Sequence, residues 1–305
     1  MRFLEVGLVP CHAFVANRRS APYRPGKVLA STFWSNGQGA LPPLIEVLVR
    51  NPLKLFKYGV AGWFPGGTRF CVLCGHRVWR FMPYRGGSRH SPPLMAALES
   101  IGSDVDNFEC PRCGSHDRER HLYLYMEAAG ILECLSSMRV LHFAPENHLS
   151  RIIEQANPME YIRCDLQPTA PEIERINIER MPFQDQSFDL VIANHVLEHV
   201  SDDILATREV HRVLAAGGLA VLQTPYSPVL HVTWSDAGIA SDQARLQAFG
   251  QEDHVRLFGR DIFDRFSESG LMAEAHDHCD LLAEVDARRL GVNPREPFFL
   301  FRRDT

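Results

Sequence analysis

The chain has 305 residues, of which 45% are hydrophobic and 23% charged, and its formal net charge is −5. This length suits one large or two ordinary domains, and the composition excludes a disordered chain, a collagen and a coiled coil. There is no run of about 18 consecutive apolar residues, so we expect no transmembrane helix.

The net charge hides an uneven distribution along the chain. Residues 1–100 contain thirteen Lys or Arg and three acids, a net of +10. The remaining 205 residues contain nineteen bases and 34 acids, a net of −15. A basic front joined to an acidic body indicates two units with different roles.

Residues 1–60 are expected to form an extension with short helices. Two apolar segments, 44–50 and 53–58, have helical character and are separated by Pro52. Their lysines would suit a membrane surface, but packing against the rest of the chain is favoured because the pieces are so short. Residues 1–30 have the composition of either an organelle transit peptide or an extension without structural importance.

Two Cys-x-x-Cys-Gly motifs predict a metal site in a small zinc-ribbon-like unit at residues 61–130. Each turn points two thiolates at one ion, and the glycine accepts the backbone conformation of a tight turn. Four thiolates complete the shell of a structural zinc and leave no open position for catalysis. The predicted ligands are Cys71, Cys74, Cys110 and Cys113.

The spacer between the two motifs, residues 75–109, exceeds the 15–20 residues usual between cysteine pairs. We therefore expect an inserted excursion with a loop at 85–93. The alternatives are chance and a redox dithiol, but a redox Cys-x-x-Cys opens a helix after a strand, and that context is missing. The eight cysteines are too sparse for a secreted disulfide scaffold, so we expect a cytoplasmic protein with reduced thiols.

Beyond the second cysteine motif, a helix is expected from about 117 to Gly130, and short apolar strands then alternate with amphipathic helices. The expected strands are 139–144, 161–165, 188–193, 219–224, 271–275 and 297–302. The expected helices are 148–156, a segment through Leu197, 202–214 ending at Gly217-Gly218, and 260–269. This alternation predicts an α/β fold with a mostly parallel sheet between two layers of helices.

In such a sheet the ligand lies at the carboxyl ends of the strands, where the strand order reverses. Ala144-Pro145-Glu146 follows the first strand, and Asp165 ends the second. An acid at that position is suited to bind two vicinal ribose hydroxyls. The dinucleotide pattern G-x-G-x-x-G is absent after the first strand, which argues against an NAD enzyme.

Three segments of the expected sheet resemble a known family. They are NIERMPFQDQSFDLV at 177–191, HVLEHV at 195–200, and EVHRVL at 209–214 leading to Gly217-Gly218. These segments are similar to class I S-adenosylmethionine-dependent methyltransferases, in the ubiquinone-biosynthesis-like branch (methyltransferase type 11). The resemblance covers about 138–225. It implies a Rossmann-like three-layer sheet with an antiparallel last strand, and an S-adenosylmethionine-binding domain at 131–305.

The resemblance also implies roles for individual residues. Asp165 matches the acid that holds the ribose hydroxyls, Asn177 the residue that meets the adenine amino group, and Ile178 an apolar residue beside the adenine ring. Asn194 and His195 match the region that faces the methionine part and the acceptor. The expected cofactor-binding set is His142, Ala144, Glu146, Asp165, Leu166, Asn177, Ile178 and Asn194.

The first motif departs from the family pattern. The family has an acid followed by three alternating glycines, whereas residues 142–148 contain no glycine. Ala144 is small enough to replace one of them, Pro145 removes a backbone donor, and Glu146 is a substitute for the missing acid. Zinc-knuckle methyltransferases with similar Leu-His-Phe-Ala-Pro-Glu loops are part of the resemblance.

The leading functional prediction is methyl transfer from S-adenosylmethionine to a small-molecule or glycan acceptor. An oxygen acceptor needs a base, and the main candidates are His195, His254 and Tyr226, with His231, Asp253 and Arg256 nearby in sequence. One alternative is an RNA base methyltransferase that uses its basic zinc unit to bind RNA. Another is a non-catalytic binding module that has lost the glycine loop. The oligomeric state is not indicated.

Overall fold

The computed structural model describes residues 52–304. The expected helix at 44–50, and most of the extension predicted at 1–60, lie outside the described residues. The segment expected to be helical at 53–58 belongs to helix α3 (Pro52–Trp63), which begins at a proline. Proline is favoured there because the first helical residue needs no backbone donor.

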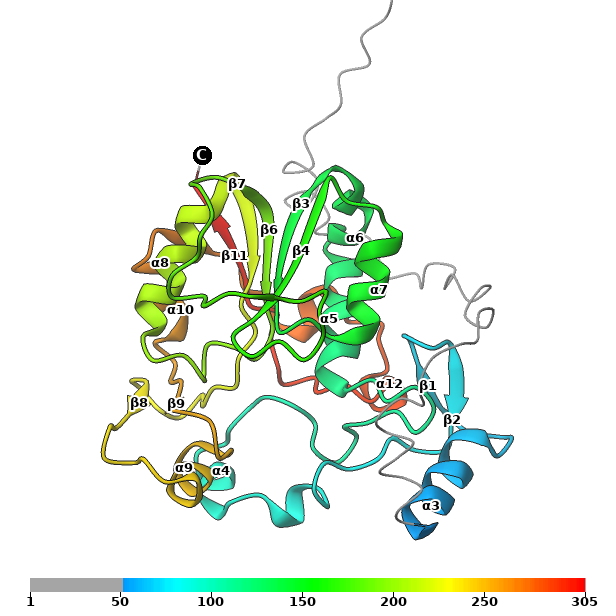
Figure 1. Ribbon diagram of the computed structural model, residues 1–305. Coiled ribbons are helices and arrows are strands. Elements are labelled where there is room, and N and C mark those ends of the chain that lie inside the picture. The colour runs from blue at the N-terminus through cyan, green and yellow to red at the C-terminus, as the bar shows by residue number, and fades with distance from the viewer. Residues whose placement is uncertain (1–51, 305) are drawn as a thin grey trace, which may run out of the picture.

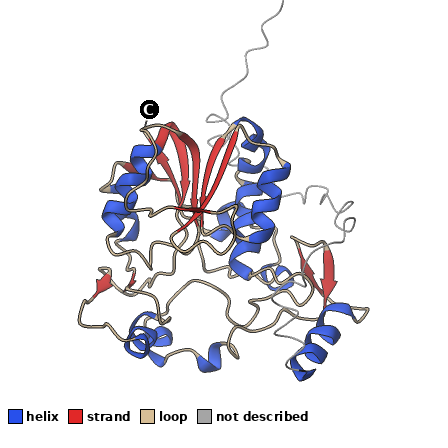
Figure 2. Ribbon diagram, viewed as in Figure 1, coloured by secondary structure: helices blue, strands red, loops and turns tan. Residues whose placement is uncertain are grey.

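The centre of the described chain is a seven-stranded sheet (Figures 1 and 2). Its strands are, in spatial order, β10 (Leu271–Ala273), β11 (Leu300–Arg303), β7 (Leu214–Val221), β6 (Phe188–Ala193), β3 (Arg139–Phe143), β4 (Glu160–Asp165) and β5 (Glu174–Arg175). Strands β3 to β7 are parallel, and β11 pairs antiparallel with both β7 and β10. The expected Rossmann-like sheet with an antiparallel last strand is confirmed.

Helices cover both faces of this sheet and make three layers (Figure 1). Leu190 and Ile192 pack in one core with α5 (Asp117–Ala128) and α7 (Asn147–Gln155). Val191 packs in a second core with α8 (Asp203–Val213) and α10 (Ile262–Ser267). Successive side chains of a strand point to opposite faces, so one continuous apolar run serves both cores.

Two sequence predictions in this region are wrong. Residues 195–200 form turns instead of a helix, because His195 has a left-handed φ of 57° that cannot begin a helical turn. Gly217-Gly218 does not separate a helix from a strand, because β7 begins at Leu214 and contains both glycines. They lie in an irregularity where Leu214 pairs with Phe188 but Leu219 pairs with Leu190.

The sequence also left several short elements unassigned. They are α4 (Pro93–Ala97), α6 (Ile131–Cys134), β8 (Trp234–Ser235), α9 (Asp242–Phe249), β9 (Arg256–Leu257), α11 (His278–Leu281) and α12 (Ala287–Leu290). Of these, α4 and α9 lie together below the carboxyl edge of the sheet in Figure 1.

The cysteine-bearing segment is continuous with the sheet domain. Its hairpin, β1 (Arg69–Cys71) with β2 (His76–Val78), buries Cys71 and Val78 in the same core as Leu122 of α5. The expected excursion continues from β2 to α4, which packs against α9. After α4, Ile101 pairs with Tyr226, which follows β7. The boundary at residue 130 stays a prediction, as do the other domain limits.

Candidate functional site

The reversal of strand order lies between β3 and β6, and both strands end in strained backbone. Ala144 has a φ of 47° and His195 a φ of 57°, in the left-handed region that favours glycine. Each conformation is held by a hydrogen bond from the residue's N–H, to the Cys164 carbonyl for Ala144 and to the Gln223 carbonyl for His195. Strain of this kind, at the place where open α/β sheets bind ligands, indicates a functional site.

Glu146 is the buried acid of this site. It accepts hydrogen bonds from His142 Nε2, at 3.1 Å, and from the Asn194 amide. Burial alone would raise the pKa of Glu146, but the hydrogen bond to His142 and the nearby Arg118 charge lower it. Glu146 is therefore an anion at neutral pH, and it joins the ends of β3 and β6.

His142 and Asn194 hold Glu146 in place. His142 is fully buried on β3, and its Nδ1 is 2.9 Å from the Tyr161 hydroxyl, so its ring lies behind the carboxylate. Asn194 Oδ1 is buried and has no hydrogen-bond partner among residues 52–304. A buried acceptor without a partner is costly, and a bound donor would satisfy it.

The residues expected around the ribose and adenine lie further along the same edge. Asp165 ends β4 and is partly exposed, and its Oδ1 accepts the N–H of Gln167 at 2.7 Å. Leu166, 58% exposed, is beside it. Asn177 is exposed in a turn after β5, where its Oδ1 accepts the Glu179 N–H, and Ile178 is buried in the core below.

His195 is part of a buried group of charges that we call the buried triad, formed by Glu198, His195 and Glu296. His195 Nδ1 is 3.1 Å from Glu198 Oε1, and its Nε2 is 3.7 Å from Glu296 Oε1. Burial alone would lower the pKa of His195, but the hydrogen bond to Glu198 and the facing Glu296 carboxylate raise it to about 9. At neutral pH His195 is therefore a cation between two anions.

The other two expected bases differ from His195. His254 is buried, and its Nδ1 is hydrogen-bonded to the Phe249 carbonyl oxygen. Its Nε2 lies 4.0 Å from Glu198 Oε1 and has no hydrogen-bond partner in the described part of the chain. Burial lowers the pKa of His254, so its ring is neutral at pH 7. Tyr226 is half-buried, and burial raises the pKa of its hydroxyl.

The first turns of α5 contain functional groups that the sequence analysis missed. Glu119 accepts the backbone N–H groups of His148 and Leu149, so it caps the start of α7 beside Glu146. The fully buried Arg120 donates to five carbonyl oxygens, and it thereby joins segment 107–115 to segment 290–291. The run Asp-Arg-Glu-Arg-His at 117–121 has the composition of an exposed first turn of a helix. Its high density of charged residues is the only sequence feature that could have indicated a functional role.

The four expected zinc ligands come together. Their Sγ atoms all lie within 4.8 Å of one another, and Cys71 Sγ is 3.8 Å from Cys113 Sγ. Tetrahedral zinc with Zn–S near 2.3 Å requires sulfur–sulfur distances of about 3.8 Å. Both motif glycines have left-handed φ, 68° at Gly75 and 76° at Gly114. The donor set and its spacing therefore fit zinc.

A second group of donors, Glu198, His199 and His254, also lies within 4.8 Å. Both oxygens of Glu198 already have partners, His195 on Oε1 and the Thr224 hydroxyl on Oε2. This group is therefore better explained as part of the buried polar network around the triad.

Comparisons with known proteins find similarity to methyltransferases in part of this domain. The sequence model of a family described as "Methyltransferase domain" matches residues 137–222, which include β3, β4, β6 and β7. The chain is 31% identical over 99 residues to a malonyl-[acyl-carrier protein] O-methyltransferase of Halorhodospira halophila, a match of 32% of this chain and 30% of that protein.

It is also 52% identical over 44 residues to a ubiquinone/menaquinone biosynthesis C-methyltransferase of Xanthomonas oryzae pv. oryzae, covering 14% of this chain and 17% of that protein. The matched stretches are thus less than a third of these relatives. Among solved structures, an S-adenosylmethionine-dependent methyltransferase from Mesorhizobium loti is 18% identical with a TM-score of 0.41, covering 59% of this chain and 100% of that one.

Among residues 52–304, none of the helices has the length and apolar composition that a membrane span requires.

Proposed function

We propose that the protein transfers a methyl group from S-adenosylmethionine to a small-molecule or glycan acceptor. One observation carries the proposal: Glu146, Asp165 and Asn194 lie at the carboxyl ends of β3, β4 and β6, inside the segment that matches the methyltransferase family. Strained backbone at Ala144 and His195 and the unsatisfied Asn194 oxygen support a ligand at the same place.

The cofactor, when bound, supplies a sulfonium methyl group that is already electrophilic. In the proposed arrangement the carboxylate of Glu146 holds the cofactor's amino group, and Asp165 accepts hydrogen bonds from the ribose hydroxyls. Asn177 and Ile178 would contact the adenine, with Leu166 beside the ribose. The protein's main task is then to align the acceptor and exclude water.

The charge of His195 bears on the choice of base for an oxygen acceptor. With a pKa of about 9, His195 is already protonated at neutral pH, so it is poorly suited to accept a proton. Its role in the proposal is to fix the 194–198 turn and supply a positive charge there. The neutral His254, with an unpartnered Nε2 among the described residues, is the better candidate base. Tyr226 is poorly suited to accept a proton, because burial raises the pKa of its hydroxyl.

We also propose that Cys71, Cys74, Cys110 and Cys113 hold one structural zinc. Their spacing fits the ion, and their hairpin shares a core with α5, so the metal would brace the wall next to the cofactor site. The four ligands are free thiols, but Cys134 forms a disulfide, so the expectation that all thiols are reduced is wrong at Cys134. A cytoplasmic location remains part of the proposal.

A second candidate is a non-catalytic module with a methyltransferase fold. It is favoured by one observation, namely that residues 142–148 contain none of the three glycines that the resemblance places there. The Cβ of Ala144 and the neighbouring ring of Pro145 restrict the approach of a cofactor to the backbone.

Binding of S-adenosylhomocysteine distinguishes the two candidates. For the enzyme, a hundredfold excess over the dissociation constant stabilises the folded state by about 2.7 kcal/mol and raises the melting temperature. Calorimetry should show that Asp165→Ala binds about 10–100-fold more weakly, because a charged hydrogen bond is worth about 1.5–3 kcal/mol. Asp264→Ala, an exposed change on α10, is the matched control. Wild-type protein that shows no stabilisation would favour the module.

A further inference from the structure

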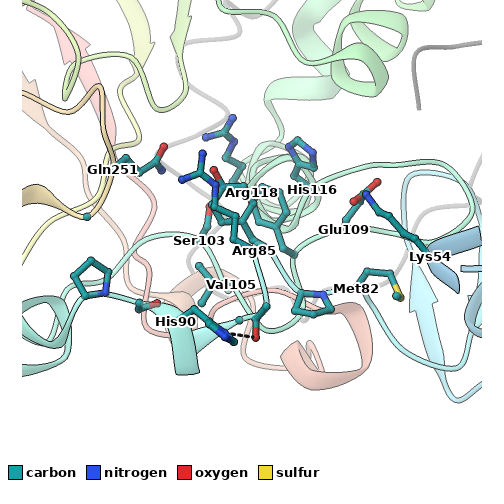
Figure 3. Close-up of a pocket in the computed structure, with 18 of the residues that line it drawn as sticks. Lys54, Met82, Arg85, His90, Ser103, Val105, Glu109, His116, Arg118 and Gln251 are labelled. Carbon is teal, nitrogen blue, oxygen red and sulfur yellow. Dashed lines mark hydrogen bonds between the residues drawn. The ribbon is translucent and has the colours of Figure 1, made fainter. Parts of the chain in front are cut away.

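A cavity of about 800 Å³ lies at the start of α5, the helix whose Glu119 caps α7 next to Glu146, and none of the roles above uses it. Its walls come from α3, from the excursion between the cysteine motifs, from the start of α5 and from the end of α9, and the side chains surround it in Figure 3. The excursion thus forms much of the wall of a partly open cavity between the zinc-site segment and α9.

The lining of this cavity is strongly basic. Four cationic side chains face it, Lys54, Lys57, Arg85 and Arg118, against the single carboxylate of Glu109. Glu109 accepts a hydrogen bond from the Tyr58 hydroxyl at 2.7 Å, and Arg85 is paired with Glu252. Lys57 and Arg118 keep their charges for a ligand, since neither has an ion pair among the described residues.

Arg118 is the key residue of the lining. It is the second residue of α5, and its Nε is buried without a hydrogen-bond partner in the described part of the chain. Nε itself has no contact with solvent, but the side chain lines the cavity, so an anion there would bind the Arg118 guanidinium with charged hydrogen bonds. Its charge also lowers the pKa of Glu146. An anion on Arg118 would therefore lie next to the cofactor site.

The rest of the lining is largely apolar and aromatic. Tyr84 and Phe108 lie with ring centroids 4.9 Å apart, and Phe108 stacks on His116 at 4.3 Å. Met82 and Leu246 add aliphatic surface. A ligand of this cavity would therefore combine an anionic group with an apolar or ring-shaped body.

We infer that the methyl acceptor is a small molecule carrying a phosphate or carboxylate group, which Arg118 binds together with Lys57. The inference rests on the proposed function and adds to it the chemical class of the acceptor. A volume of about 800 Å³ lies within the range of small-ligand sites. The basic front of the chain then contributes to an anion site in a cavity rather than to a nucleic-acid surface.

The first test is anion binding by the full-length protein saturated with S-adenosylhomocysteine. Calorimetry is done with inorganic pyrophosphate and with citrate, as probes of the phosphate and carboxylate classes. At least one should bind, and Arg118→Gln should weaken it about tenfold or more. Lys57→Gln, on the exposed side of α3, should weaken it less without disturbing the fold. Arg208→Gln, exposed on α8 and outside the cavity, should leave affinity unchanged.

The second test identifies the product. Tritiated methyl groups are transferred from S-adenosylmethionine to a fractionated cell extract, and the labelled product is applied to an anion exchanger at pH 7. Retention supports the inference, and loss of retention after phosphatase treatment assigns the anion to a phosphate rather than a carboxylate.

A labelled product that passes the exchanger unretained, or one that ribonuclease digests, would overturn the inference while leaving methyl transfer intact. So would binding of neither probe, or binding that both Arg118→Gln and Lys57→Gln leave unchanged. Absence of S-adenosylhomocysteine binding would instead reject the proposed function itself, so the two failures are distinguishable.

Discussion

The buried triad predicts a specific dependence of stability on pH. His195 is 7% exposed and has a pKa of about 9 in the folded protein, compared with 6.5 in an unfolded chain. The protonated form is therefore favoured by folding. Its contribution is fully present below pH 6.5 and is lost as the pH rises to about 9.

The size of the effect follows from the two pKa values. One pKa unit is about 1.4 kcal/mol, so the difference between the folded and unfolded values corresponds to about 3 kcal/mol of unfolding free energy. Replacing His195 by glutamine keeps a side chain that can bond to Glu198 but removes the charge that Glu198 and Glu296 share. Wild-type protein should exceed His195→Gln in stability at pH 6 and lose about 3 kcal/mol of that advantage by pH 10.

Urea unfolding followed by tryptophan fluorescence measures this difference at intervals from pH 6 to pH 10. Comparing the two proteins at each pH removes the contribution of lysines, tyrosines and thiols that titrate in both. A matched variant, His211→Gln, replaces a more exposed histidine on α8, outside the buried triad, and is the control. If the stability difference between wild type and His195→Gln is independent of pH, the charged state assigned to His195 is wrong.

Three further predictions concern the metal, the packing and the strained loop. Protein purified without chelator should contain about one zinc per chain, and Cys110→Ser should lower both the zinc content and the melting temperature. Cys279→Ser, which changes an exposed free thiol, should change neither quantity. A wild-type protein that is folded but free of zinc would contradict the site. Arg120→Met should cost about 4 kcal/mol or more in urea unfolding because it leaves buried carbonyls unpaired, and a loss below about 1 kcal/mol would show that they find other partners. Ala144→Gly should stabilise the protein by about 0.5–1 kcal/mol, because glycine adopts the left-handed φ without strain. The control Ala128→Gly, in α5, should destabilise it by about 1 kcal/mol. Loss of stability in both variants would refute backbone strain at Ala144.

Several features of this protein follow from short stretches of sequence. The buried run 188–193 indicates a strand, because a strand packed on both faces needs continuous apolar residues. Each Cys-x-x-Cys-Gly turn indicates a paired metal ligand, since its geometry is set within five residues. Asp165 was predicted to lie at the ligand site because parallel strands bring their carboxyl ends to one edge, whereas the expected role of Asn194 came from the resemblance to the methyltransferase family.

Other features depend on contacts between distant segments, and only the tertiary structure decides them. The sequence predicts His195 as a candidate base, but in the folded protein Glu198 and then Glu296, about a hundred residues away, raise its pKa and give it a charge. Arg118 reads as a solvated helix residue, yet the excursion folds against α9 and makes it part of a cavity wall.

The physical reason is that charge state and cavity shape are properties of an environment. Local sequence determines a residue's chemistry and its preferred backbone conformation, but burial and facing charges determine its pKa and its available partners. The basic front of the chain was evident from the sequence at once. Three of its cations line one cavity together with Arg118, and this depends on the tertiary structure, in which the excursion packs against α9.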